Sequence, residues 1–289
     1  MALYFGKRRP LSRTAQYVLA FIGLLLGLAI MISWLTIRMR QSTPNEQTEN
    51  SDPSSMYVES PTTVGHALLI LDTDKRDYFM LIKTDPVKNQ ILVSNLPTTM
   101  VAEDTTLQKL WQKHGPIRAT KAVAETLALP VNHYVQLDET GMVEFLNYFE
   151  DGITITLPES IHTRDENGAP IRLSTGKNKL VAQQTAAVIR HTGWKEKQNA
   201  SKTVTSLVSA IFNQYLLPET SFNGYFSALA NTSQTDLRID HYNSYKDTLA
   251  HLATQNAGEI CHVVTLEGTT TDGLYRPDVK SMKRKSPLY

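Results

Sequence analysis

The order of apolar and polar residues after position 64 predicts short strands first and amphipathic helices further along the chain. Apolar runs bounded by turn-forming residues are typical of buried strands, and the first three such runs lie at 66–72, 78–84 and 90–96. The segment 85–89 contains Asp, Pro, Lys and Asn. It therefore predicts a turn that joins the second and third strands as neighbours.

Helical spacing of apolar residues alternates with further strand-like runs in the rest of the chain. The spacing predicts helices at 106–114, 117–129, 139–150, 181–191, 201–217, 220–229 and 245–253. The additional apolar runs predict strands at 133–138, 152–157 and 260–266. The segment 162–175 is interpreted as a polar excursion between elements. Strands that alternate with helices indicate an α/β fold, in which helices sandwich a mixed β-sheet.

Residues 17–36 form an uncharged apolar stretch that is long enough to cross a bilayer. As a helix it would rise ~30 Å, the thickness of the hydrocarbon core. Four cations precede it and two follow it, which places the N-terminus inside. We therefore expect a cytoplasmic segment at 1–16 and a transmembrane signal anchor at 17–37, in a single-pass cell-membrane protein whose C-terminal domain is extracellular. The alternative is a cleaved signal peptide, whose apolar stretch is usually only ~7–15 residues long.

The chain after the predicted anchor divides into a spacer, one domain and a tail. Residues 38–64 are rich in Ser, Thr, Pro, Asn and Glu and predict a flexible linker. Residues 65–280 carry all the predicted strands and helices, and we interpret them as one extracellular domain. The basic residues near the C-terminus predict a tail at 281–289, with 280–285 expected to fray.

Charge and cysteine content exclude several classes of protein. The chain has 29 Lys and Arg against 28 Asp and Glu, a formal net charge of +1. Proteins that coat nucleic acid carry a strong basic excess, so we expect no nucleic-acid partner. Cys261 is the single cysteine, which excludes a scaffold of intramolecular disulfides.

Two carboxylates flank the turn between the first two predicted strands. Asp72 ends one strand and Asp77 precedes the next. Ligands bind at strand ends in α/β sheets, and carboxylate oxygens suit Mg²⁺. The pair can therefore hold Mg²⁺ against a phosphate. On spacing alone, a charged turn exposed to solvent is the stronger interpretation.

Arg190 follows the apolar residues 186–189 at the end of a predicted helix. A guanidinium in such a position can bind a phosphate through two parallel hydrogen bonds. It can equally extend to solvent while its stem packs against apolar neighbours. The residues alone leave both interpretations open.

The order of these features resembles the LytR-CpsA-Psr family of membrane-anchored proteins of bacterial cell envelopes. Residues 68–86, LLILDTDKRDYFMLIKTDP, resemble its first motif, in which an Asp ends a strand before a basic and acidic turn. Leu129-Pro130, Asp165 and the stretch 173–190 resemble later motifs in the same order. The resemblance runs from about 67 to 278. It implies the family layout of one membrane helix followed by an extracellular α/β/α domain.

The resemblance also implies a reaction and a set of site residues. Family members transfer the phosphoglycosyl end of a polyprenyl-pyrophosphate-linked glycopolymer to a peptidoglycan hydroxyl, with Mg²⁺ and arginines neutralising the pyrophosphate. It implies Arg190 and Asp77 as catalytic residues, and Asp72 with Asp77 as the Mg²⁺ ligands. The pyrophosphate-binding residues that it implies are Lys75, Arg76, Lys109 and Gln198. The implied partners are the lipid-linked glycopolymer, peptidoglycan and the bilayer.

Some positions depart from the family pattern. Thr98 and Thr99 stand where the family has Arg and Asp, and Thr192 stands where it has a second arginine. Losing one charged donor in a catalytic site costs ~10²–10³ in rate. Two hypotheses follow. The chain is either a phosphotransferase of cell-wall assembly, or a catalytically impaired module that binds lipid-linked glycan or an envelope assembly partner.

Overall fold

The structure is a computed structural model that describes residues 64–165, 168–216, 222–255 and 259–289. The predicted cytoplasmic segment, signal anchor and nearly all of the linker therefore lie outside the described residues. Within the described ranges, no helix combines the length and the apolar character needed to span a bilayer.

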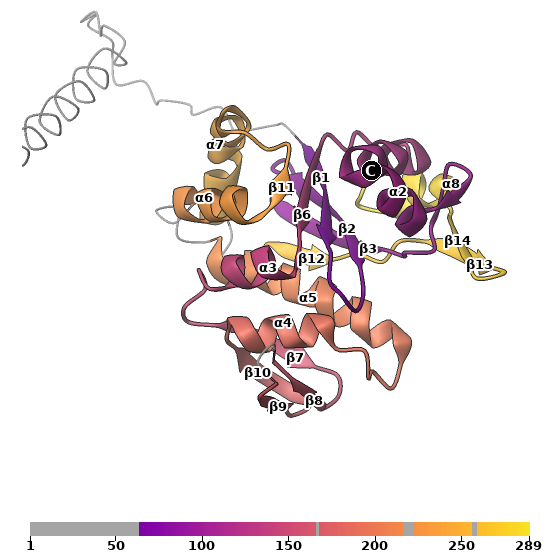
Figure 1. Cartoon of the computed structure of the whole chain (residues 1–289). Coiled ribbons are helices and arrows are strands. Elements are labelled where there is room, and N and C mark those ends of the chain that lie inside the picture. The colour runs from indigo at the N-terminus through magenta and orange to yellow at the C-terminus, as the bar shows by residue number, and fades with distance from the viewer. Residues whose placement is uncertain (1–63, 166–167, 217–221, 256–258) are drawn as a thin grey trace, which may run out of the picture. The chain divides into compact units, whose positions relative to one another are not determined.

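A six-stranded mixed sheet forms the centre of the domain (Figure 1). Its strand order is β11 (Gln234–Thr235), β6 (His133–Leu137), β1 (Gly65–Leu71), β2 (Tyr78–Asp85), β3 (Gln90–Leu96) and β12 (Cys261–Val263). The three N-terminal strands pair antiparallel, as the predicted hairpin requires. β6 pairs parallel with β1, and β12 pairs parallel with β3. The predicted mixed sheet is confirmed.

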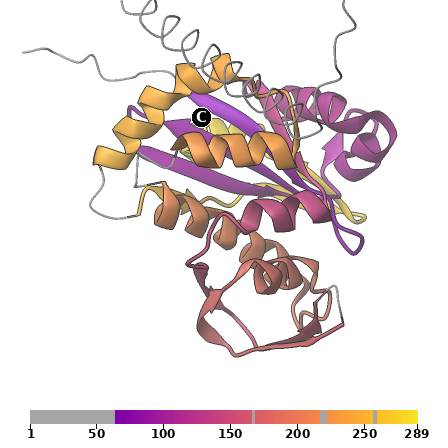
Figure 2. The ribbon, with the colours of Figure 1, turned by 60° about the vertical axis from the view of Figure 1, so that its left-hand side comes forward.

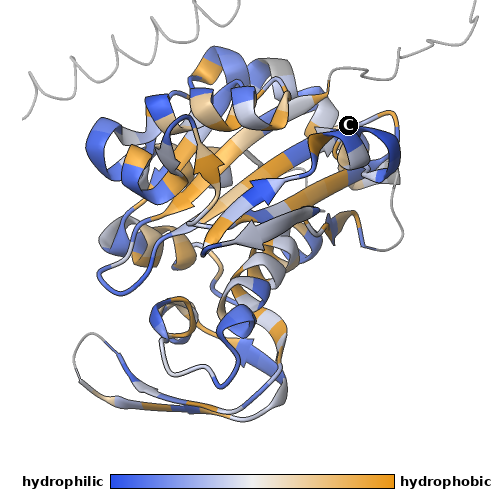
Figure 3. Ribbon diagram, turned by 90° about the vertical axis from the view of Figure 1, so that its right-hand side faces the viewer, coloured by the Kyte–Doolittle hydropathy of each residue, from blue (hydrophilic) through white to orange (hydrophobic). Residues whose placement is uncertain are grey.

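Helices cover both faces of this sheet, because successive strand residues point to opposite sides. Leu68 and Ile70 of β1 pack into one core, with α2 (Leu107–Leu127) and α8 (Val279–Lys285). Leu69 and Leu71 pack into the other core. Figures 2 and 3 show helices on either side of the sheet. The helices on that second face are α3 (Glu139–Leu146), α4 (Ala182–Arg190), α5 (Lys197–Tyr215), α6 (Phe222–Thr232) and α7 (Ile239–Gln255).

Shorter strands complete the fold outside the main sheet. β4 (Val101–Ala102) pairs with β5 (Thr105–Thr106) before α2, and β13 (Gly268–Thr271) pairs with β14 (Leu274–Pro277) before α8. α8 differs from the sequence prediction, because residues 280–285 were expected to fray and instead form most of this helix. The Asp278 side chain caps its N-terminus, and Met282 is fully buried. The cap and the buried Met282 side chain hold this otherwise polar segment against the domain.

The second difference is a two-stranded ribbon beyond α4 and α5 (Figure 1). It pairs β7 (Ile153–Leu157) with β10 (Gly176–Leu180), and β8 (Ile161–Arg164) with β9 (Pro170–Leu173). The segment 162–175, interpreted as a polar excursion, thus contains most of β8, all of β9 and their connection. Because only alternate residues such as Ile161 and Leu173 are buried, these strands show no continuous apolar run.

α2 contains a kink at the boundary between the two predicted helices 106–114 and 117–129. Gly115 has φ +77° and ψ −176°, and Pro116 follows it. This backbone region is essentially restricted to glycine and costs other residues about 1–3 kcal/mol. The kink therefore depends on the residue type at position 115.

We expect Gly115→Ala to lower the free energy of unfolding by about 1–3 kcal/mol, because alanine cannot adopt this backbone conformation without strain. A Cβ at Gly115 meets no atom within 4 Å, so a steric clash does not contribute. Gly224, inside α6, also has open space around a Cβ and no positive φ. Gly224→Ala should therefore stabilise by up to about 1 kcal/mol. Chemical denaturation of the full chain in detergent measures the free energy of unfolding of both variants. Equal changes in the two variants would contradict backbone strain at position 115 as the cause.

Candidate functional site

A tight loop, residues 72–77, joins β1 to β2 and carries most of the charged residues singled out in the sequence. Thr73 is buried, its hydroxyl donates to the Arg76 carbonyl at 2.7 Å, and the Arg76 amide donates back to that hydroxyl at 3.0 Å. This pair of bonds closes the loop. The Asp72 amide also donates to the Leu137 carbonyl at 2.8 Å, which extends the pairing of β1 with β6 to the first loop residue.

Three carboxylates gather at the ends of these strands. Because Leu71 is in register with Leu137, Asp72 and Asp138 follow neighbouring parallel strands. Burial raises the pKa of Asp72, and repulsion from the charges of Asp77 and Asp138 raises it further. Asp138 also caps α3, since its Oδ1 accepts the Gly141 amide at 2.8 Å. The strand ends thus hold negative charges close together.

Two glutamine side chains connect Asp72 and Asp77 to α2. Gln108 of α2 donates to Asp77 Oδ2 at 2.8 Å, and Asp77 is only 8% exposed. Gln136 of β6 donates to Asp72 Oδ2 at 3.3 Å and accepts from the Trp111 indole at 3.2 Å. The donors fix the orientation of both carboxylates, although neither donor carries a charge.

We expect Asp72→Asn to stabilise the fold near neutral pH by on the order of 1 kcal/mol, because it removes repulsion between close carboxylates. A raised pKa means that the folded state binds the proton more tightly than the unfolded state, whose reference pKa is 3.8. The stabilisation from Asp72 is therefore complete below that value and is lost as the pH rises through the folded-state pKa. The advantage of asparagine should disappear in acid.

Denaturation of the full chain at about pH 7 and at about pH 3 checks this sign. Asp74 provides the control, since its hydrogen bond to Lys75 lowers the pKa of Asp74. Asp74→Asn should therefore bring no gain near neutral pH. A gain for Asp72→Asn that persists in acid would contradict the assignment of repulsion as the cause.

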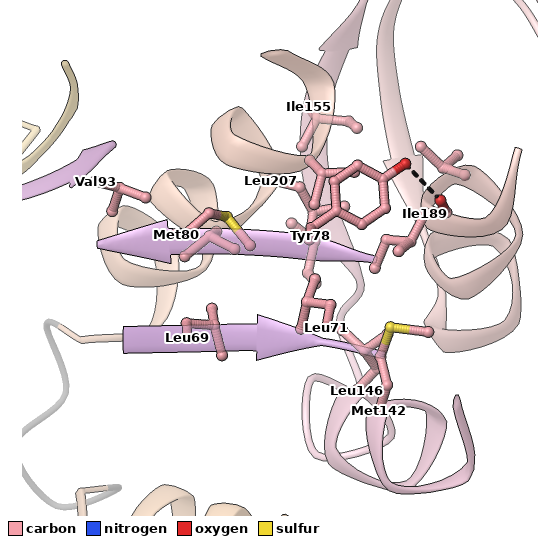
Figure 4. Packing of buried hydrophobic residues seen from close by; sticks show 14 of the residues in the cluster. Leu69, Leu71, Tyr78, Met80, Val93, Met142, Leu146, Ile155, Ile189 and Leu207 are labelled. Carbon is pink, nitrogen blue, oxygen red and sulfur yellow. Dashed lines mark hydrogen bonds between the residues drawn. The ribbon is translucent and has the colours of Figure 1, made fainter. Parts of the chain in front are cut away.

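Arg190 is the last residue of α4 and forms an ion pair with Glu139, the first residue of α3. The side chains are 14% and 28% exposed, respectively. The preceding residue fixes the end of α4, because the Ile189 carbonyl accepts the Tyr78 hydroxyl at 2.9 Å (Figure 4). Glu139 also interacts with Asp74. Arg190 therefore lies beside the loop at 72–77, among acidic side chains.

An apolar cavity of about 330 Å³ lies between the sheet and the helices of the second face. Leu71, Leu137 and Ile189 line it, and each is followed directly by a charged residue of the site. On α5, a stripe of apolar residues divides into two parts. Val204 packs fully buried in the core, whereas the later members line the cavity, namely Leu207, Val208, Ile211 and Phe212.

The cavity wall is close-packed where α3 meets α6. A Cβ built on Gly141 would lie only 1.9 Å from the carbonyl oxygen of Thr232. α3 contributes Met142 and Phe145 to the lining, and α6 contributes Phe226. The absence of a side chain at position 141 therefore sets how closely two walls of the cavity approach each other.

The remaining predicted site residues lie at different distances from the carboxylates. Lys75 is exposed and pairs with Asp74 at 2.8 Å. Burial raises the pKa of Tyr78, and the neighbouring Arg76 partly offsets this effect, which places Arg76 next to the hydroxyl bound to α4. Lys109 follows Gln108 and is exposed.

Gln198 lies apart from this group. It is exposed at the start of α5 and donates to Glu196 at 2.9 Å. Among the contacts of the described residues, none joins Gln198 to the loop at 72–77. The pyrophosphate-binding role implied for it stays a prediction that this arrangement does not support.

The donor set fits Mg²⁺ only in part. Within the described ranges, no group of three or more His, Cys, Asp or Glu side chains is arranged to hold a metal. Mg²⁺ commonly uses one or two carboxylates together with waters and substrate phosphates. Asp72 and Asp77 therefore fit an ion that the phosphates of a substrate help to bind.

Sequence reasoning missed several residues of the site. Asp138 ends a strand just as Asp72 does, so the same signal was present. Gln108, Gln136 and Glu139 carried no signal, because only the fold brings them to the loop. Cys261 is buried, and this burial raises the pKa of its thiol to about 12.

Comparisons with known proteins agree with the fold. The sequence model of the LytR_cpsA_psr family matches residues 36–285. A search of curated proteins finds no match. A protein from Eubacterium siraeum, provisionally described as a transcription regulator, has a TM-score of 0.69 at 17% identity, covering 83% of this chain and 97% of its own.

Two further solved structures are similar. TagV from B. subtilis has a TM-score of 0.64 at 13% identity, covering 78% of this chain and 94% of its own. A structure of TagT bound to LI-WTA has a TM-score of 0.58 at 12% identity, covering 82% of this chain and 92% of its own. At these identities, the likeness shows a shared fold.

Proposed function

Since this chain belongs to the LytR-CpsA-Psr family, we propose that it is a membrane-anchored transferase of the cell envelope. Its substrate is a glycopolymer linked to a polyprenyl pyrophosphate, and its acceptor is a sugar hydroxyl of peptidoglycan. The reaction takes place on the outer side of the cell membrane. A likeness to TagT bound to LI-WTA is consistent with a lipid-linked envelope glycan as the donor.

One observation carries this proposal. Asp72, Asp138 and Arg190 each directly follow a residue that lines the apolar cavity. A polyprenyl pyrophosphate has a long apolar chain joined to a charged head. Such a molecule matches a cavity lined mainly by Leu, Ile, Phe and Tyr, with charged residues directly following three of its lining residues.

In the proposed reaction, each residue of the site has a separate role. The acceptor oxygen attacks the phosphorus that carries the sugar, and the bond from that phosphorus to the bridging oxygen breaks. Polyprenyl phosphate leaves with the bridging oxygen and its electron pair. Arg190 stabilises the charge that develops on the phosphoryl oxygens. Asp77 takes the hydroxyl proton on Oδ1, while Gln108 holds its other oxygen.

Asp72 and Asp77 would hold Mg²⁺ together with the donor's phosphates. When bound, the ion would neutralise charge on the pyrophosphate. Glu139 pairs with Arg190 through Nη1, and a guanidinium carries five N–H donors in all. The donor phosphate can therefore share Arg190 with Glu139, or replace Glu139 as its partner.

A transfer assay tests the proposal. The full chain in vesicles, supplied with Mg²⁺, a polyprenyl-pyrophosphate-linked glycan and peptidoglycan, should release polyprenyl phosphate and label the peptidoglycan. Asp77→Ala should abolish both products. Arg118→Ala serves as the control, because Arg118, which lies on α2, pairs with Glu103 outside the site. Absence of product above the Asp77→Ala background would reject the proposal.

A second function is favoured by one specific observation. The single arginine kept from the family's pair is already paired with Glu139, and Thr192 is exposed where the other would stand. The Thr98 carbonyl accepts the amide of Gln108 at 3.2 Å, which places another substituted position near Asp77. A module that binds lipid-linked glycan without turnover would show tight binding that Asp72→Ala leaves unchanged, and no product.

A further inference from the structure

Trp111 of α2 lies close to the proposed reaction site and is only 8% exposed. Its ring packs edge-on against Phe79 of β2, with the ring centroids 5.7 Å apart and an interplanar angle of 78°. A phenylalanine ring can make the same kind of contact, because the attraction depends on the two rings alone. The indole N–H is therefore the part of Trp111 that packing does not explain.

This N–H is the first donor in a chain of two hydrogen bonds that ends at Asp72. It donates to Gln136 Oε1 at 3.2 Å, and Gln136 Nε2 donates to Asp72 Oδ2 at 3.3 Å. Gln136 is in register with Ile70, whose side chain packs in the core on the α2 side of the sheet. Paired residues of neighbouring strands point to the same face, so the fold directs Gln136 toward Trp111.

The indole fixes the direction of this chain. A side-chain amide has an accepting oxygen and a donating nitrogen, and its two orientations occupy nearly the same space. An indole can only donate. It therefore selects the orientation in which Gln136 Oε1 faces Trp111 and Nε2 faces Asp72. With the amide turned over, its oxygen would face a carboxylate oxygen, and neither atom could donate.

Asp72 needs a directional contact because other negative charges lie near it. Asp77 and Asp138 repel its carboxylate, and repulsion alone favours any rotation that moves the charges apart. Among the hydrogen bonds of the described residues, the Asp72 side chain accepts only the one from Gln136, at Oδ2. That bond restrains the carboxylate and leaves Oδ1 available to a cation, which binds through such oxygens.

We propose that Trp111 is a positioning residue of the reaction site, which acts through Gln136 to hold the Asp72 carboxylate with Oδ1 available to the cation. The inference rests on the proposed function, in which Asp72 and Asp77 hold Mg²⁺ together with the donor's phosphates. It predicts that a cation at Asp72 and the indole N–H of Trp111 are coupled, although α2 supplies no ligand. A packing role alone predicts no such coupling.

Magnetic resonance of the indole N–H groups tests the coupling without any turnover. The chain has three tryptophans, and the full chain in neutral detergent, isotopically labelled at the indole nitrogens, gives one signal for each. Magnesium pyrophosphate should shift the Trp111 signal in the wild type, and Gln136→Leu should abolish that shift. Trp194 is the internal reference, because its indole donates to the His191 carbonyl at 2.8 Å. Gln136→Leu should leave its signal in place.

The affinity for magnesium pyrophosphate, measured by calorimetry, tests the same coupling energetically. Trp111→Phe keeps an aromatic ring and removes the N–H, so it should weaken binding about two- to tenfold, the usual effect of one hydrogen bond. Gln136→Leu should weaken binding at least as much. The double variant should bind no more weakly than Gln136→Leu alone, because residues that act through one shared contact are not additive.

Phe79→Leu is the control for packing. It removes the ring that contacts Trp111 and keeps the indole N–H, so it should lower thermal stability and leave the affinity unchanged. Three results would overturn the inference. They are an unmoved Trp111 signal in the wild type, additive losses in the double variant, and equal weakening of binding by Phe79→Leu and Trp111→Phe.

The transfer assay separates this inference from the proposed function. If transfer occurs, Trp111→Phe should raise the KM for Mg²⁺ about two- to tenfold, and an unaltered KM would reject the inference alone. If transfer never occurs while the coupling is measured, the proposed function fails and the positioning role of Trp111 stands.

Discussion

Replacing Arg190 with alanine should lower kcat about 100- to 1,000-fold in the transfer assay, the usual effect of removing one donor that stabilises transition-state charge. The expectation is strong for this residue because the arginine that the family has two positions later is Thr192 here. Arg190→Lys should recover only part of the activity, since an ammonium group cannot make two parallel bonds to a phosphate.

The controls separate catalysis from folding. Arg190→Ala leaves Glu139 without its partner in a half-buried position, so some loss of stability is expected as well. Glu139→Gln keeps Arg190 and removes the competing charge. It should preserve turnover, and it should tighten donor binding if Glu139 competes with phosphate. Equal activity of Arg190→Ala and the wild type would contradict the assignment of Arg190 to the reaction.

Filling the cavity should abolish use of the lipid-linked donor while leaving the fold intact. Val208 of α5 lines the cavity of about 330 Å³. Val208→Phe places its added atoms in open space, so the free energy of unfolding should change by less than about 1 kcal/mol. The lipid chain loses that space, and we expect kcat/KM for the polyprenyl donor to fall about tenfold or more, because apolar burial contributes ~0.8 kcal/mol per CH₂.

Val204 provides a control one turn earlier on the same helix. It is fully buried and is not among the residues that line the cavity. Val204→Phe should therefore overpack the core and lower stability by about 1–3 kcal/mol. Thermal unfolding and turnover are measured on both variants. Val204→Phe should lower the stability, whereas Val208→Phe should lower kcat/KM for the polyprenyl donor. If Val208→Phe keeps full activity with a long-chain donor, the lipid does not occupy this cavity.

The central strands were predictable because their side chains are buried on both faces. Continuous apolar runs marked β1, β2 and β3, and the break of α2 at Gly115 followed from a glycine and a proline. β8 and β9 were not predictable in the same way. Each has only four residues, and alternation over so short a length resembles an ordinary polar loop.

The sequence predicted those site residues that directly follow an apolar run. Asp72 and Arg190 each follow an apolar residue at the end of an element, and those apolar residues, Leu71 and Ile189, line the cavity. Their partners come from distant parts of the chain. Gln108 is 31 residues from Asp77, and Glu139 is 51 residues from Arg190. Such pairs depend on the parallel pairing of β1 with β6 and on the packing of α3 against α4, which no local pattern specifies.

Gly141 links the width of the apolar cavity to the orientation of Asp138. Its missing Cβ lets α3 and α6 approach closely, and its amide donates to Asp138. Any larger residue would push the two helices apart and turn that carboxylate away from its neighbours. The width of the cavity, which the proposed lipid chain would occupy, and the orientation of the Asp138 carboxylate therefore both depend on position 141.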